Sequence, residues 1–184
     1  MRIIAGNYRS RLLKTLQGDN TRPTTDKVRE AVFSRLGPYF DSGSVLDLFA
    51  GSGAVALEAI SRGYDEAVLS DKSREAVMII KDNISTLKAE SYCTVWQCDY
   101  KQTLKRCRDK EKQFDLIYVD PPYRMVLGSS VLKLIGEYDL LKETGVVILE
   151  TGTDEEVEIE KPFELDKEAR YGVTKLTYVR KERP

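Results

Sequence analysis

The sequence contains no histidine. This absence excludes mechanisms that depend on a Ser-His or Cys-His pair and removes the commonest ligand of transition metals. Cysteine is scarce, and because Cys93, Cys98 and Cys107 are odd in number and have no CxxC spacing, we expect reduced, structural thiols and no metal. No stretch approaches the roughly 18 apolar residues of a membrane span, and residues 1–6 lack the longer apolar run of a signal peptide. A cytoplasmic protein with no membrane partner is therefore expected.

Net charge is also nearly absent, at -1 over 184 residues, but it is unevenly distributed. Residues 1–36 carry eight Lys or Arg against three Asp or Glu, residues 37–160 carry 14 against 23, and residues 161–184 carry seven against four. A local basic face can bind phosphates even when the total charge is near zero. The N-terminal segment is thus the candidate nucleic-acid surface, with a solvated charged face as the alternative. Its candidate contacts are Arg2, Arg9, Arg11, Lys14 and Arg22.

The spacing of apolar residues predicts one α/β domain over residues 23–184, preceded by a small basic β-hairpin extension over residues 1–22. Thr24 or Thr25 is the expected N-cap of the first helix, because Pro23 interrupts what precedes it. Strands are predicted at residues 44–50, 67–70, 93–97, 114–119, 145–149, 157–159 and 173–179, and helices at 28–36, 54–62, 73–87, 100–110 and 130–141. Such alternation is typical of a doubly wound, mostly parallel sheet.

An acidic residue lies in or just after each of the first four predicted strands. These residues are Asp47, Asp71, Asp99 and Asp120. Ligands bind at the carboxyl ends of the strands in an open parallel sheet, so four acids at that edge indicate a binding site.

A glycine turn follows the first of these strands. Gly51, Gly53 and Ala56 match the GxGxxG/A pattern, and Asp71 lies 20 residues after Gly51, so the fingerprint of NAD or FAD is formally satisfied. Asp47 would, however, place a carboxylate where a dinucleotide puts its pyrophosphate. S-adenosylmethionine has no phosphate and carries cationic sulfonium and ammonium groups, so this acid favours it. Its predicted binding residues are Thr24, Asp47, Phe49, Gly51, Gly53, Asp71, Asp99 and Tyr100.

The predicted catalytic residues are Asp120, Pro121, Pro122 and Tyr123, which follow the buried run at residues 114–119. Proline has no N–H but keeps its carbonyl, so the acid and the proline carbonyls can accept hydrogen bonds from an amino group. The tyrosine ring offers a flat face on which a planar base can stack. The motif therefore indicates recognition of an amino-bearing nucleobase, whereas two prolines alone would more often mark a plain turn closing a strand.

Four groups of residues occur together in this chain: residues 2–6 (RIIAG) with Arg11, residues 22–26 (RPTTD) with Arg29 and Glu30, residues 47–53 (DLFAGSG) with residues 57–59 (LEA), and residues 120–123 (DPPY). In these residues and their order the chain resembles the RsmD family of small-subunit ribosomal RNA guanine-N2 methyltransferases. The DPPY motif is shared with adenine-N6 methyltransferases, whereas the RPTTD segment is the specific part.

The resemblance implies a Rossmann-like class I methyltransferase with a seven-stranded sheet and a reversed last strand. It also implies methylation of a guanine N2 amine in 16S rRNA or a small ribosomal subunit particle. We expect the protein to act as a monomer. Two alternatives stay open: an adenine-N6 methyltransferase of DNA or RNA, and a ribosome assembly factor that keeps the fold.

Overall fold

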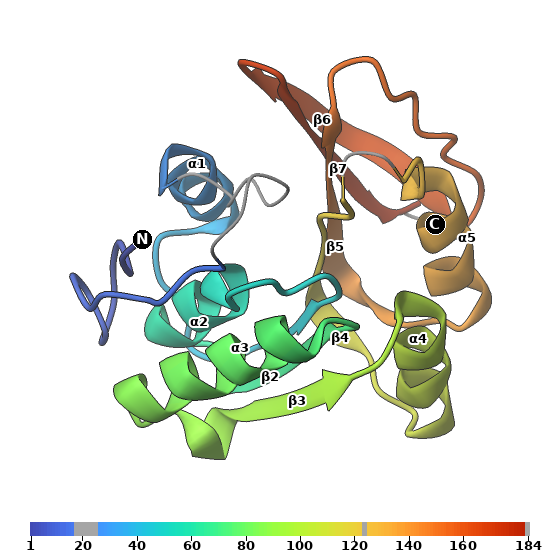
Figure 1. Ribbon diagram of the computed structural model, residues 1–184. Coiled ribbons are helices and arrows are strands. Elements are labelled where there is room, and N and C mark those ends of the chain that lie inside the picture. Colours follow the sequence, from blue (N-terminus) through green and yellow to red (C-terminus); the bar gives the residue numbers. More distant parts are fainter. Residues whose placement is uncertain (17–25, 123–124, 183–184) are drawn as a thin grey trace.

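The computed structural model describes residues 1–16, 26–122 and 125–182. This part of the chain contains five α-helices, one short 3-10 helix and a seven-stranded sheet (Figure 1). None of these helices has both the length and the apolar character needed to cross a lipid bilayer. In chain order the elements are α1 (Asp26–Leu36), β1 (Ser44–Asp47), α2 (Ala54–Ser61), β2 (Glu66–Asp71), α3 (Arg74–Leu87), η1 (Glu90–Tyr92), β3 (Cys93–Gln97), α4 (Tyr100–Asp109), β4 (Phe114–Val119), α5 (Gly128–Glu137), β5 (Leu141–Gly152), β6 (Phe163–Tyr171) and β7 (Thr174–Lys181).

The strands lie in the order β3-β2-β1-β4-β5-β7-β6. From β3 to β5 all neighbouring strands are parallel, whereas β7 runs antiparallel to both β5 and β6. The sheet is therefore mostly parallel with one reversed strand. This arrangement confirms the predicted doubly wound sheet and its reversed last strand.

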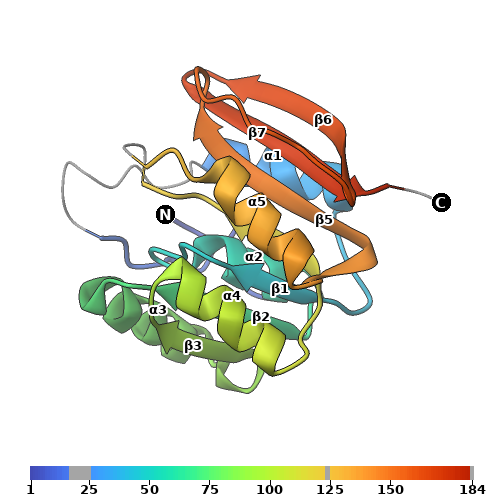
Figure 2. The same cartoon turned by 90° about the vertical axis from the view of Figure 1, so that its right-hand side faces the viewer.

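Helices cover both faces of the sheet, with α1, α2 and α3 on one face and α4 and α5 on the other (Figure 2). Alternate residues of the central strands supply the two cores: Val45 and Leu116 face the first helices, and Leu46 and Ile117 face the second pair. Strands that are covered on both faces have nearly continuous apolar sequences, because successive side chains point to opposite faces and each face is buried in a core. This property explains why the central strands are predictable from sequence.

The C-terminal part of the sheet departs from the prediction. β5 begins at Leu141 and not at residue 145, and the strand predicted at residues 157–159 is wrong. Val157 and Ile159 instead pack as partly buried side chains against the core under α5. The strand of this region is β6, whose side chains are mostly exposed because it lies at the edge of the sheet. An exposed edge strand has no apolar pattern, so periodicity alone does not find it.

The N-terminal segment folds back on itself and packs against α2. Arg2 and Leu12 form a single antiparallel bridge, and the Ile3 N–H donates to the Arg11 carbonyl at 2.9 Å. Gly6 has a φ of +85°, and a Cβ atom there would lie 1.8 Å from the Ser61 carbonyl oxygen. Only glycine fits this close approach. The expected hairpin is thus present over the described residues 1–16 as one bridge and a tight turn.

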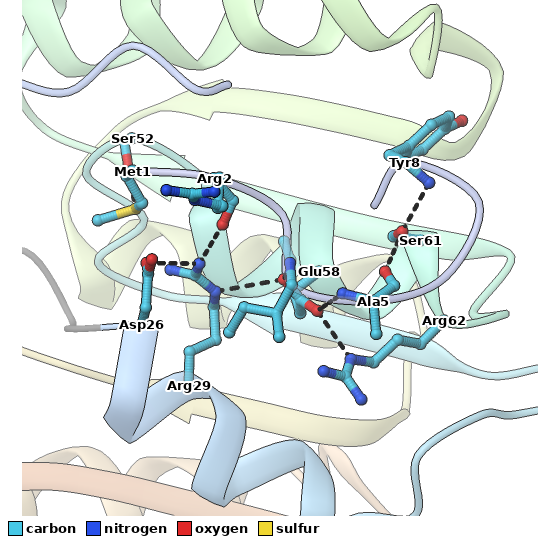
Figure 3. Close-up of polar contacts among 12 residues, drawn as sticks. Met1, Arg2, Ala5, Tyr8, Asp26, Arg29, Ser52, Glu58, Ser61 and Arg62 are labelled. Carbon is cyan, nitrogen blue, oxygen red and sulfur yellow. Dashed lines mark hydrogen bonds and ion pairs between the residues drawn. The ribbon is translucent and has the colours of Figure 1, made fainter. Parts of the chain in front are cut away.

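A buried carboxylate, Glu58 of α2, holds this segment in place (Figure 3). Its Oε2 accepts from the Ile4 N–H at 2.9 Å, and its Oε1 accepts from the Ala5 N–H at 3.0 Å. Two guanidinium groups approach the same carboxylate: Arg29 Nε lies 3.3 Å from Oε2 and Arg62 Nε lies 2.8 Å from Oε1. Paired charges and complete hydrogen bonding are the condition under which such a group is tolerated in a core.

Arg29 extends the same cluster to α1. Its Nη2 donates to the Arg2 carbonyl at 2.5 Å and to Asp26 Oδ1 at 3.0 Å, while its own side chain is fully buried. One arginine therefore connects the N-terminal segment, α1 and α2. The predicted nucleic-acid segment therefore contacts α2, which is also the helix that directly follows the predicted cofactor turn.

Candidate active site

The four predicted acids lie at the same edge of the sheet. Asp47 is the last residue of β1 and Asp71 the last residue of β2. Asp99 lies two residues after the end of β3, and Asp120 directly follows β4. The strand register brings the acids close to one another along the edge. Asp47 pairs with Leu69 of β2 and with Tyr118 of β4, each of which lies two residues before the acid at its own strand end. The structure thus brings these acids to the carboxyl edge, where open parallel sheets bind ligands.

The glycine turn is held by Asp71. The Gly51 N–H donates to Asp71 Oδ2 at 3.0 Å, and the Ser73 N–H donates to its Oδ1 at 2.9 Å. Gly51 and Gly53 have φ values of 56° and 79°, which glycine adopts without strain. A Cβ at Gly51 would meet open space, whereas one at Gly53 would lie 2.9 Å from Leu69 Cδ2. The turn therefore packs closely on β2 through Gly53 and leaves room for a ligand over Gly51.

Asp47 lies beneath this turn and is only 2% exposed. Its Oδ2 accepts a hydrogen bond from the Ala56 N–H at 3.2 Å, so it supports the start of α2 from inside. The pKa of Asp47 is raised to about 7, mainly by burial, and the hydrogen bond from the Ala56 N–H lowers it while the charges of Asp71 and Glu150 raise it. Asp47 therefore supports the glycine turn from the protein interior. Its negative charge near neutral pH is smaller than the full charge assumed when the sequence alone was used to favour S-adenosylmethionine.

Two further predicted cofactor residues, Asp99 and Tyr100, lie at the start of α4, and a third, Phe49, follows β1 and contacts Tyr100. Asp99 is exposed and caps the helix, accepting from the Gln102 N–H at 2.9 Å. Phe49 and Tyr100 are both half-buried, and their ring centroids lie 5.7 Å apart at an interplanar angle of 35°. An exposed carboxylate beside a pair of aromatic rings can accept from an amino group and contact a flat ring. These are the features that an adenosyl group requires.

The predicted catalytic stretch leaves the sheet at the end of β4. Asp120 is half-buried, Pro121 is buried and Pro122 is exposed. The Pro122 carbonyl accepts from the Met125 N–H at 2.8 Å, and α5 begins three residues after Met125. Tyr123 lies outside the described residues. The same holds for Thr24, a predicted cofactor residue, and for Arg22, a predicted nucleic-acid contact.

Sequence reasoning missed two residues next to this stretch, Tyr118 and Glu150. The Tyr118 hydroxyl donates to Glu150 Oε2 at 2.5 Å, and both side chains are buried. Burial, followed by the charges of Glu150 and Asp120, raises the pKa of Tyr118 well above its ordinary value. A signal was present, because Glu150 follows an apolar strand in the same way as the four predicted acids do.

The four predicted basic residues that the structure describes are exposed, and two of them contact α3. Arg11 Nη2 donates to the Thr86 carbonyl at 2.7 Å, and Lys14 Nζ pairs with Asp82 at 2.7 Å. Arg2 and Arg9 have exposed side chains on the same segment. Since exposed ion pairs are weak, these contacts leave the positive charge available to a polyanion.

Strand order, the reversed β7, the glycine turn after β1 and the acids at the carboxyl edge together define a Rossmann-like class I methyltransferase fold. A solved structure, the Escherichia coli protein yhhF, superposes with a TM-score of 0.83 at 29% identity, over 100% of this chain and 99% of that chain. The predicted fold class is confirmed. Free cysteines are also as predicted, with Cys107 buried.

The family model described as "Conserved hypothetical protein 95" matches residues 1–180, so the chain belongs to this family, the RsmD family. YlbH of Bacillus subtilis is 38% identical over 184 residues, which cover 98% of this chain and 99% of that protein. "Ribosomal RNA small subunit methyltransferase D" of Haemophilus influenzae is 32% identical over 174 residues, covering 94% of this chain and 90% of that protein. The predicted family is confirmed, and fold and family together support S-adenosylmethionine as the cofactor.

Proposed function

We propose that this protein transfers a methyl group from S-adenosylmethionine to the exocyclic N2 amine of a guanine in 16S rRNA. The observation that carries the proposal is the position of Asp120, Pro121 and Pro122, at the carboxyl end of β4 in the strand next to the glycine turn. This position supports the proposal, because Asp120 and the proline carbonyls are acceptors for an amino group at the sheet edge that we propose binds the methyl donor. An exocyclic amine beside a cofactor turn is the geometry of an amino-directed methyltransferase.

The donor site is assigned to residues whose chemistry fits the adenosyl and methionine groups. Asp71 offers its carboxylate to the ribose hydroxyls, Asp99 accepts from the adenine amino group, and the open space over Gly51 leaves room for the methionine end. When bound, S-adenosylmethionine supplies an electrophilic methyl group on a cationic sulfur. Phe49 and Tyr100 add an apolar wall beside the adenine.

The acceptor site works by orienting the amine. The lone pair of the guanine N2 atom is delocalised into the ring, so this amine is a poor nucleophile while it stays planar. Acceptance of its two N–H bonds by the Asp120 carboxylate and the Pro121 carbonyl favours a pyramidal nitrogen and fixes the direction of the lone pair. The product cation is acidic and releases its proton readily, so a chain without histidine suffices. Tyr123 is proposed to stack on the flipped base, a contact worth roughly 1 to 3 kcal/mol.

The RNA substrate is inferred from the relatives and from charge. The Haemophilus influenzae relative is named as a methyltransferase of small-subunit ribosomal RNA. The exposed cations Arg2, Arg9, Arg11 and Lys14, with Arg22 beyond the described residues, supply contacts to phosphates. We propose that the enzyme acts as a monomer, without a metal, on 16S rRNA within the small subunit or its precursor in the cytoplasm.

Identification of the methylated nucleoside tests this proposal. Purified protein with labelled S-adenosylmethionine and unmodified small-subunit RNA or particles is expected to form N2-methylguanosine, detected by nucleoside mass spectrometry. Large-subunit RNA is the control and is expected to stay unlabelled. N6-methyladenosine as the product would replace the proposal with the adenine-N6 alternative, and binding without any methylation would favour the assembly-factor alternative.

A second prediction concerns the cofactor carboxylate at the end of β2. Asp71→Ala is expected to weaken S-adenosylmethionine binding by about 1 to 3 kcal/mol, because it removes an acceptor and releases the Gly51 N–H. Isothermal titration calorimetry measures the change. Asp65→Ala is the matched control, since Asp65 accepts from the Gly43 N–H at 3.2 Å at the opposite end of the same strand. Unchanged affinity in Asp71→Ala, or NAD or FAD binding at micromolar concentration, would contradict the assignment.

A further inference from the structure

Helix α4 carries an unexpected basic face in the acidic part of the chain. Residues 101–112 contain six Lys or Arg and two Asp or Glu, whereas the rest of residues 37–160 contains eight against 21. Five of the six cations are exposed. The sequence analysis predicts this helix at residues 100–110 but assigns it no function. The cations are Lys101, Lys105, Arg106, Arg108, Lys110 and Lys112.

Within the described part of the chain, four of these cations form no ion pair with an acidic residue. Arg108 pairs with Asp109 and Lys112 pairs with Glu66. The cations that form no ion pair with any described residue are Lys101, Lys105, Arg106 and Lys110. Lys101 and Lys105 are four residues apart and therefore lie on one side of the helix. Their charges are available to a ligand from outside the chain.

Aromatic side chains orient the cations of this face. The Arg106 guanidinium lies 4.4 Å from the ring centroid of Trp96, and that of Arg108 lies 4.7 Å from the ring centroid of Tyr138. Lys101 Nζ lies 5.9 Å from the ring centroid of Tyr100. A guanidinium held over an aromatic ring is already restricted in conformation, so less side-chain entropy is lost when it binds a phosphate.

The position of α4 connects this face to the active site. The helix begins at Tyr100, directly after its cap Asp99, so Lys101 is two residues from the proposed adenine acceptor. α4 lies on the opposite face of the sheet from α1 and α3, and hence from the basic N-terminal segment that contacts α3 (Figure 2). A polyanion that reaches the carboxyl edge can therefore meet cations on both faces of the sheet.

The neighbouring surface along α5 has the opposite charge. Residues 154–160 contain five acidic side chains, and this segment is fixed against the start of α5. Glu155 Oε1 accepts from the Gly128 N–H at 3.2 Å, and Ser129 Oγ accepts from the Glu158 N–H at 2.9 Å. Like charges repel a phosphate backbone, so a strand of RNA is directed away from α5 and toward α4.

We infer that α4 and the turn that follows it, residues 101–112, bind the phosphate backbone of the substrate RNA as a second contact surface, separate from the N-terminal segment. This inference rests on the proposed RNA substrate. It extends the proposal by assigning RNA contacts to both faces of the sheet. A polyanion fits because the surface offers several exposed cations, oriented by aromatic rings, with an acidic border.

The test is a salt titration of binding to small-subunit RNA by the full chain and its Lys101→Gln/Lys105→Gln variant. The slope of log affinity against log salt is expected to become shallower by about 1.4 to 1.8 for two lost phosphate contacts. Affinity for S-adenosylmethionine is expected to stay within twofold, which separates RNA binding from damage to the neighbouring cofactor site. Arg9→Gln serves as the comparator on the N-terminal segment, with an expected change of about 0.7 to 0.9.

Lys161→Gln/Lys167→Gln is the matched control, because it removes two positive charges from the β6 end of the sheet. If this control changes the slope as much as the α4 variant does, the effect comes from total charge and the inference is overturned. An unchanged slope in the α4 variant, with RNA still bound and methylated, overturns the inference alone. A wild-type protein that shows no salt-dependent RNA binding overturns both the inference and the proposed function.

Discussion

Replacing Asp120 by alanine is expected to lower the rate of methyl transfer by at least about 100-fold, and up to about 1,000-fold, which is typical of removing one group that stabilises developing charge. Cofactor affinity is expected to stay within a few-fold, because Asp120 serves the acceptor amine. Its position supports this division: Asp120 follows β4, whereas Asp71, which holds the glycine turn, ends β2. Single-turnover kinetics with saturating RNA, together with calorimetry for S-adenosylmethionine, measure the two quantities separately.

Asp115→Ala is the matched control for Asp120→Ala. Asp115 lies near the start of the same strand, where its Oδ2 accepts from the Ser44 N–H at 2.8 Å and pairs with Lys142 at 2.7 Å. Its loss is expected to lower stability while leaving the rate of methyl transfer on folded protein nearly unchanged. An equal loss of cofactor affinity in Asp120→Ala would instead place Asp120 in the donor site.

The sequence predicts an element well where its local pattern of apolar residues agrees with its burial in the folded protein. The strand at Phe114–Val119 was predicted with both ends correct, because its side chains enter a core on each face of the sheet. β6 shows the opposite case. Its side chains are mostly exposed, and its position is determined by pairing with β7, so its sequence FELDKEARY contains little that distinguishes it from a loop.

The candidate site was predictable as a set of acids at strand ends, but the environment of each acid was not. Asp47 and Asp71 occupy similar places in sequence, yet Asp47 is buried under the turn and Asp71 binds it from the side. Burial depends on which segments cross over a strand end, and these segments are distant in sequence. For the same reason the pair of Tyr118 and Glu150 was missed, since it joins β4 to β5 across 32 residues.

The structure also shows why the N-terminal segment should influence the cofactor site. Glu58 contacts the segment through the backbone of Ile4 and Ala5, and it lies on the helix that begins directly after Gly53. Loss of this contact would free the basic residues and remove a support of α2 at once. Glu58 therefore contributes to the stability of the fold and connects the proposed RNA-binding segment with the helix of the proposed cofactor site.

Glu58→Ala is expected to lower the free energy of unfolding by about 3 to 5 kcal/mol, the range for removing one partner of a buried ion pair. The substitution leaves Arg29, which is fully buried, and Arg62, which is nearly so, without their shared carboxylate. Two backbone N–H groups lose their acceptor as well. Urea denaturation followed by circular dichroism measures the change, and domains of this kind have only about 5 to 15 kcal/mol in total.

Asp82→Ala provides the control for this prediction, because it breaks an ion pair of the same N-terminal segment at the surface. Lys14 and Asp82 lie 2.7 Å apart with side chains 65% and 57% exposed, so the expected loss is at most about 1 kcal/mol. Salt should weaken the Lys14 pair, whereas the buried cluster around Glu58 is screened far less. Comparable losses in the two variants would mean that the buried charges contribute no more than a surface pair. A large loss in Glu58→Ala alone, accompanied by weaker RNA binding in the fraction that remains folded, would establish that this one carboxylate fastens the N-terminal segment to the cofactor helix.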